Sequence, residues 1–124
     1  MSGESEVKAG RLTAGMSEES SQLAVRLGGH ADQPEVVDAL SALWMRVHAR
    51  ALDIKAPVVT VDLRPLEFMS SSCFRTFVVW LSHLAQSKDG ERYRVRFLAD
   101  ATRYWQRRGL QALSAFARDV VTVE

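Results

Sequence analysis

The sequence has little of several residue types on which particular classes of protein depend. It contains a single cysteine, Cys73, which excludes an internal disulfide and a cluster of thiolate metal ligands. It has no run of about twenty apolar residues, so we expect no membrane span. Its amino terminus is polar and acidic rather than basic and then apolar, so we also expect no signal peptide and a cytoplasmic location.

Charge of either sign is not in large excess either. The formal net charge of +1 over 124 residues is too close to zero for generic nucleic-acid binding by counterion release. The stretch 91–119 differs from the rest, because it holds seven arginines and three acidic residues; the arginines are Arg92, Arg94, Arg96, Arg103, Arg107, Arg108 and Arg118. We interpret this stretch as a solvated face and keep a patch for an acidic partner as the alternative.

The patterns that bind metals and phosphates are missing. The three histidines, His30, His48 and His83, have no spacing typical of metal ligands. Gly28-Gly29 lacks the lysine and the spacing of a phosphate-binding loop. We therefore predict no metal and no cofactor.

A hydrolase would need a nucleophilic serine and a histidine base within hydrogen-bond reach of each other. Ser71 and His83 lie twelve positions apart on one expected helix, about 18 Å along its axis at 1.5 Å per residue. His30 could approach Ser71 from another loop, but no glycine-flanked nucleophile elbow surrounds the serine. The sequence thus predicts a protein that is not an enzyme.

What the sequence does have is a clear central pattern at residues 58–84. The run 58–63 is β-branched and apolar, which is typical of a strand buried on both faces, and Arg64-Pro65 ends it because proline cannot donate to a sheet. Apolar residues then recur at helical spacing: Phe74, Phe77, Val78, Leu81 and Leu84. Three serines at 70–72 precede this run, and serine is favoured at a helix start because its hydroxyl accepts a first-turn N–H.

Strands and helices alternate in the rest of the chain. We expect residues 1–21 to be flexible and residues 22–124 to form one domain. The remaining expected elements are a strand at 23–27 that stops at Gly28-Gly29, a helix from about Asp32-Gln33-Pro34 to before Pro57, a strand at 93–98, a helix from 100–102 to a left-handed end at Gly109-Leu110, a connector at 113–116 and a strand at 120–123. This order predicts an α/β domain with a largely parallel sheet.

Several short segments resemble the STAS domain, the fold of bacterial anti-sigma-factor antagonists. Asp62-Leu63 and Phe68-Met69 fit the end of a buried strand and the loop that follows it in that family. Gly29-His30-Ala31-Asp32 is similar to the Gly-x-Leu-Asp that closes another family strand, and Gly109-Leu110 is similar to the end of a short third helix. Ser70-Ser71-Ser72-Cys73 stands where the family usually has Asp-Ser-Ser-Gly with its first serine phosphorylated, so the first and last of these four positions differ.

The resemblance covers 23–124 and implies a STAS-like α/β fold: a mixed sheet of four or five strands packed with about three helices, without the family's final helix. Because the family commonly has a strand near its amino terminus, the resemblance implies a short edge strand at 7–12 as an alternative to a fully flexible 1–21. It implies a signalling protein that binds an anti-sigma-type serine kinase, or a related regulator, through the 64–74 loop and helix start. It implies phosphorylation of Ser71, with Ser70 and Ser72 as alternatives. The residues that it implies for partner binding are Arg64, Met69, Ser70, Ser72, Cys73, Phe74, His30 and Asp32.

A constitutive scaffold or assembly subunit is the alternative function. In that case the three serines only cap the helix, and the surface binds a fixed partner or another copy of the chain in a homodimer. The sequence leaves open the identity of the partner and the oligomeric state.

Overall fold

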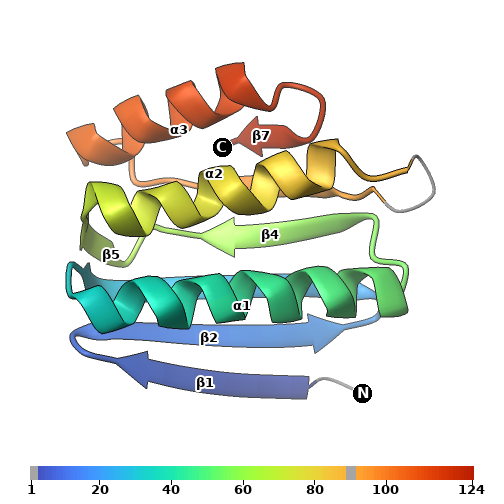
Figure 1. Ribbon diagram of the computed structural model, residues 1–124, viewed down its shortest axis with the longest axis horizontal. Helices are drawn as coiled ribbons and strands as arrows, with labels where there is room; N and C mark the ends of the chain where they lie inside the picture. The colour runs from blue at the N-terminus through green and yellow to red at the C-terminus, as the bar shows by residue number, and fades with distance from the viewer. Residues whose placement is uncertain (1–2, 89–91) are drawn as a thin grey trace.

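The computed structural model of the chain describes residues 3–88 and 92–124, with side chains from residue 6 onward. The elements are β1 (Gly3–Ala9), β2 (Leu12–Glu19), β3 (Gln22–Ala31), α1 (Pro34–Asp53), β4 (Val58–Asp62), β5 (Leu66–Met69), α2 (Ser71–Ala85), β6 (Arg94–Leu98), α3 (Tyr104–Phe116) and β7 (Val121–Val123). They form two layers, because the three helices lie side by side over one face of a single sheet (Figure 1). This confirms the expected mixed α/β architecture with three helices.

The strands form one mixed sheet in the order β1-β2-β3-β4-β6-β7, and β5 pairs with the far end of β3. In the amino-terminal hairpin β1 pairs antiparallel with β2, and β2 pairs antiparallel with β3, whereas β4, β6 and β7 run parallel to β3 and to each other. Each parallel step is bridged by a helix, since two parallel strands cannot be joined by a tight turn. The carboxyl ends of β3, β4 and β6 therefore share one end of the sheet.

The core lies between the sheet and the helices. Leu23, Val25 and Leu27 of β3 are buried and alternate with more exposed neighbours, as expected for a sheet covered on one face. Aromatic rings fill the space above them. Trp44 of α1 stacks on Trp80 of α2 at 4.7 Å between ring centroids, and Phe77 contacts the Trp44 ring at 5.0 Å and the Phe97 ring at 5.3 Å. Of the apolar residues expected on one face of α2, Phe77, Leu81 and Leu84 are thus confirmed as core, and Phe74 and Val78 are partly buried against it.

A buried hydrogen-bonded chain joins α1, α2 and β6 inside this core. Trp80 Nε1 donates to the Tyr93 hydroxyl at 2.8 Å, and the same hydroxyl lies 2.9 Å from His48 Nδ1. The indole can only donate, so the Tyr93 oxygen accepts from Trp80, and the direction of the bond between Tyr93 and His48 depends on the tautomer of the histidine. Burial raises the pKa of Tyr93 to about 12. The polar atoms of Trp80, Tyr93 and His48 are therefore buried in the core with hydrogen-bond partners.

The amino-terminal segment differs from the expectation of a flexible 1–21. From residue 3 onward it forms two strands of a hairpin, which raises the number of strands in the sheet to seven instead of four or five. The segment has few large apolar residues, but Leu12 and Ala14 are buried, and Glu18 forms a 2.7 Å ion pair with Arg50 of α1. Backbone pairing with β3 supplies the rest of the order.

The structure also contradicts the expectation that Gly28-Gly29 ends a strand and that Gly109 ends a helix. Gly28-Gly29 does not end β3, which continues to Ala31; Gly29 instead has a φ of +85°, and a Cβ there would lie 2.3 Å from the Arg11 carbonyl oxygen. Gly109 does not end a helix in left-handed conformation, because α3 continues through the supposed connector at 113–116. A Cβ on Gly109 would lie 2.8 Å from Phe74 Cε2, so this glycine allows α3 to approach α2.

Other expectations about boundaries are confirmed. β4 ends at Asp62 just before Arg64-Pro65, and α1 has Gln33 as its N-cap and Pro34 in its first turn. Within the part of the chain that the structure describes, no helix has both the length and the apolar composition to cross a bilayer.

We expect Phe77→Ala to lower the free energy of unfolding by about 3–5 kcal/mol, because Phe77 is fully buried between α1, α2 and β6. Val79→Ala on the same helix is the control, since Val79 is 63% exposed and its truncation should change stability by less than about 0.5 kcal/mol. Urea unfolding of both variants measures the difference. Equal midpoints would show that the buried face of α2 is assigned wrongly.

Candidate functional site

The candidate site lies at the end of the sheet where the parallel strands finish. The end of β3, the β4–β5 connection, β5 and the first turns of all three helices meet there, at the left of Figure 1. This follows from the topology, because each parallel strand delivers its following helix from the same edge. In open α/β sheets this edge is the common location of binding sites.

Ser70 holds the start of α2. Its hydroxyl accepts the Cys73 backbone N–H at 3.2 Å, and its carbonyl accepts the Phe74 N–H at 2.9 Å. Its own N–H donates to the Ala31 carbonyl at 2.8 Å, which ties the helix start to the end of β3. Ser70 is therefore the N-cap, so of the three serines it has the structural role that the sequence left unassigned.

Ser71 and Ser72 have a different environment. Both are exposed residues in the first turn of α2, and no hydrogen bond among residues 3–88 and 92–124 involves the Ser71 hydroxyl. The unpaired first-turn amides of a helix give its start a partial positive charge, which favours an anion there. A negative group added at Ser71 would thus be compatible with the fold.

The segment before α2 is fixed by its own arginine. Arg64 donates from its guanidinium to both oxygens of Asp62, at 2.9 and 3.0 Å, and from its backbone N–H at 3.0 Å. These bonds hold the pKa of the Asp62 carboxyl below its usual range. The Arg64 side chain remains largely exposed while it makes these bonds.

Two side chains of α3 form hydrogen bonds to the segment 63–67, which precedes α2. Gln106 is fully buried and donates from Nε2 to the carbonyls of Leu63 and Leu66, at 2.7 and 2.9 Å. Its Oε1 accepts the Asp100 N–H at 2.9 Å, and Trp105 Nε1 donates to the Glu67 carbonyl at 3.0 Å. These hydrogen bonds cannot be predicted from the sequence, because a glutamine inside an amphipathic helix gives no signal in the apolar periodicity.

Two residues expected to contact a partner are not accessible. Met69 is 7% exposed and Cys73 is fully buried, because both side chains belong to the hydrophobic core. The expectation of direct contact from these two residues is therefore wrong. Cys73, which stands where glycine is usual in the STAS motif, sends its thiol into the core and not onto the surface.

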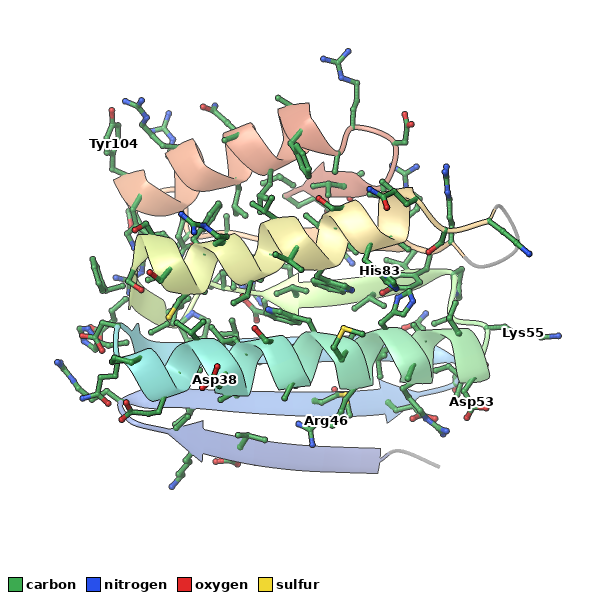
Figure 2. All side chains as sticks on the ribbon, in the orientation of Figure 1. Asp38, Arg46, Asp53, Lys55, His83 and Tyr104 are labelled. Atoms are coloured by element: carbon green, nitrogen blue, oxygen red, sulfur yellow. The ribbon has the colours of Figure 1, made fainter. Side chains whose placement is uncertain are left out.

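The other expected residues lie at this end with varied exposure. Arg64 and Ser72 are exposed, whereas Ser70, Phe74, His30 and Asp32 are partly buried. His30 Nε2 lies 3.2 Å from Glu67 Oε2, and Asp32 Oδ2 lies 3.6 Å from Arg11 Nη1. Two large exposed side chains were not among the residues expected to bind a partner. Phe68 of β5 is 45% exposed, and Tyr104, which projects from the first turn of α3 in Figure 2, is 66% exposed. We use the name serine surface for Arg64, Glu67, Phe68, Ser71 and Ser72.

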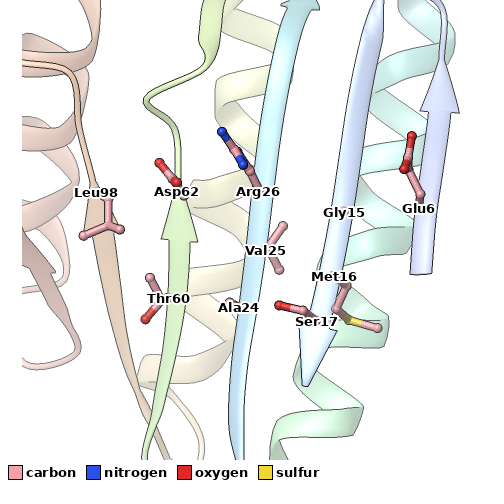
Figure 3. A pocket seen from close by; sticks show the side chains of 10 residues that line it. All are labelled: Glu6, Gly15, Met16, Ser17, Ala24, Val25, Arg26, Thr60, Asp62 and Leu98. Atoms are coloured by element: carbon pink, nitrogen blue, oxygen red, sulfur yellow. The ribbon is translucent and has the colours of Figure 1, made fainter. Parts of the chain in front are cut away.

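No group of three or more His, Cys, Asp or Glu side chains that could hold a metal ion occurs in the described ranges. A hollow of about 640 Å³ lies on the sheet face opposite the helices, lined among others by Gly15, Ala24, Arg26, Thr60 and Asp62 (Figure 3). It adjoins the serine surface at Asp62, whose carboxylate binds Arg64.

Comparisons with known proteins bear on the fold of the chain. No family model and no curated protein matches the sequence. Among solved structures, the chain is similar to an anti-sigma factor antagonist from Mycobacterium paratuberculosis, with a TM-score of 0.63 and 16% sequence identity over 85% of this chain and 81% of the other. At this identity the likeness shows the fold alone, and the expectation of a STAS-like fold is confirmed.

The two neighbouring serines should differ in stability when truncated. We expect Ser70→Ala to lower the free energy of unfolding by about 1 kcal/mol, because it removes the cap of α2. Ser71→Ala is the matched control and should change it by less than about 0.5 kcal/mol, because that hydroxyl is exposed. Thermal or urea unfolding compares the variants. A larger loss for Ser71→Ala than for Ser70→Ala would contradict the assignment of the cap.

Proposed function

We propose that this chain is a non-enzymatic, cytoplasmic regulatory protein of the anti-sigma-factor-antagonist type. It binds a protein partner, an anti-sigma-type serine kinase or a related regulator, through the serine surface. Phosphorylation of Ser71 ends that binding. The observation that supports this proposal is that two neighbouring serines differ in environment: Ser70 caps α2, whereas Ser71 is exposed in its first turn.

The departures from the usual STAS motif are compatible with this function. Ser70 replaces an acidic residue, and its hydroxyl does what an aspartate also does at an N-cap by accepting a first-turn N–H. Cys73 replaces glycine, and its burial leaves the outer surface of the first turn free of its side chain. The proposal is also supported by the likeness in fold between this chain and a solved anti-sigma factor antagonist.

The switch follows from local electrostatics. A phosphate adds a charge of about −1.5 to −2 at neutral pH. In the free protein the start of α2 and surrounding water accommodate that charge. In the complex, a partner packed on Ser71 and Phe68 would have to remove water from it, which is costly without a matching cation. The modification therefore leaves the fold intact and weakens the interface.

Ser71→Asp should weaken partner binding at least tenfold, about 1.4 kcal/mol, because the carboxylate must be desolvated in the contact. Ser71→Ala should bind like the unmodified protein. Ser41→Asp is the matched control, since Ser41 is an exposed serine on α1 and its charge is added away from the serine surface. Affinities are measured by titration against a serine kinase partner captured from the host, with melting curves for each variant.

The scaffold alternative gives a different result in the same titration. If the serines only cap α2, Ser71→Asp would bind the partner as well as Ser71→Ala and Ser41→Asp do. Equal affinities for all of these variants would rule out a switch at this residue.

A further inference from the structure

The second and third helices leave an apolar stripe between them. Both follow parallel strands and run in the same direction, α2 beside α3, in Figure 1. Gly109 of α3 lies directly against the Phe74 ring of α2, as the 2.8 Å approach of its missing Cβ shows. This contact defines which side of each helix faces the other.

Helical spacing extends the stripe from that contact. Val78 is four residues beyond Phe74 on α2, and both are only partly buried against the core. Ala112 and Phe116 are three and seven residues beyond Gly109 on α3, and both are exposed, Phe116 by 55%. By helical spacing, the four side chains Phe74, Val78, Ala112 and Phe116 belong to the sides of α2 and α3 that face each other at the Gly109–Phe74 contact, and we call them the α2–α3 stripe.

The charges beside the stripe are of one sign. Neither α2 nor α3 contains an aspartate or a glutamate. Arg75 adjoins Phe74, and Arg108 adjoins Gly109; both are exposed. Arg75 makes no ion pair with any described residue, and Arg108 is held by the Tyr104 hydroxyl at 2.8 Å and by its ring rather than by a carboxylate. Both guanidinium groups are therefore available to an external anion.

The first helix shows the contrast. It carries carboxylates as well as arginines on its outer face, and Asp38, Arg46 and Asp53 all project from it in Figure 2. Arg50 of α1 is bound by Glu18 and Asp53. A solvated helix face typically carries both signs in this way, whereas the α2–α3 stripe has apolar side chains between cations and no internal counter-charge.

We propose that the α2–α3 stripe binds an acidic amphipathic helix of a partner protein. The apolar side of such a helix would lie on Phe74, Val78, Ala112 and Phe116, and its carboxylates would meet Arg75 and Arg108. A nucleic acid fits less well, because the centre of the surface is aliphatic and aromatic and the net charge of the whole chain is only +1. Arg75 lies one helical turn beyond Ser71, so the stripe begins beside the serine surface.

This inference deepens the proposed function and rests on it only in identifying the partner as a protein. It states the chemistry by which the partner is recognised, and it can fail while the switch at Ser71 stands. Loss of the phosphorylation switch would likewise leave the stripe in place.

The test uses a synthetic helical peptide of 15 residues, the length of α2, with leucine on one face and glutamate on the other. Backbone amide chemical shifts of the full chain are followed by NMR during titration at low and high salt. A peptide with lysine in place of glutamate, a duplex DNA and vesicles of phosphatidylcholine with phosphatidylserine are titrated in parallel. The expected result is saturable binding of the acidic peptide that shifts amides of α2 and α3 and weakens with salt.

Matched variants separate recognition from general charge. Arg75→Glu combined with Arg108→Glu should weaken peptide binding at least tenfold, whereas Arg46→Glu combined with Arg94→Glu changes the net charge equally and should leave binding within twofold. Phe116→Ser should weaken it, and Met45→Ser, at a similarly exposed position on α1, should not. Equal effects of both charge pairs, preference for the lysine peptide, or tighter binding to DNA or vesicles would overturn the proposal.

Discussion

The geometry of the serine surface depends on the buried side chain of Gln106. Its amide joins three backbone groups from separate parts of the chain: the carbonyls of Leu63 and Leu66 before and within β5, and the N–H of Asp100 after β6. A buried amide with all of these partners is directional, so it fixes the distance between α3 and the β4–β5 connection in a way that apolar packing alone does not. Trp105 adds a second bond to the same segment at Glu67.

The site is therefore built from parts that lie far apart in sequence but meet at one edge of the sheet. The parallel register of β3, β4 and β6 brings their ends together, Ser70 anchors α2 to Ala31, and α3 holds β5 in place. Ser71 is exposed in the first turn of α2, and no hydrogen bond among the described residues uses its hydroxyl. A residue of that kind can carry a charge without disturbing the fold, which is the physical requirement for a reversible switch on a stable domain.

The central strand, the serine-rich helix start and the α/β class can be predicted from the sequence, because they depend on local patterns of apolar spacing, proline and capping. Order that depends on partners distant in the chain cannot be predicted in this way. The hairpin of β1 and β2 is held largely by pairing with β3, Gly109 is required by the ring of Phe74 rather than by a turn, and the role of Gln106 exists only once Leu63, Leu66 and Asp100 are near it. The burial of Met69 and Cys73 was missed for a related reason, since a motif identifies positions but not the direction of side chains.

We propose that two of the three adjacent serines have separate roles, with Ser70 structural and Ser71 regulatory. Peptide mass spectrometry of the protein purified from its own host, with site localisation within the 70–72 triplet, tests this directly. The account predicts a phosphate on Ser71 and none on Ser70, whose hydroxyl is engaged by the Cys73 amide. A phosphate on Ser70, or an unmodified triplet in cells where the partner kinase is active, would contradict it.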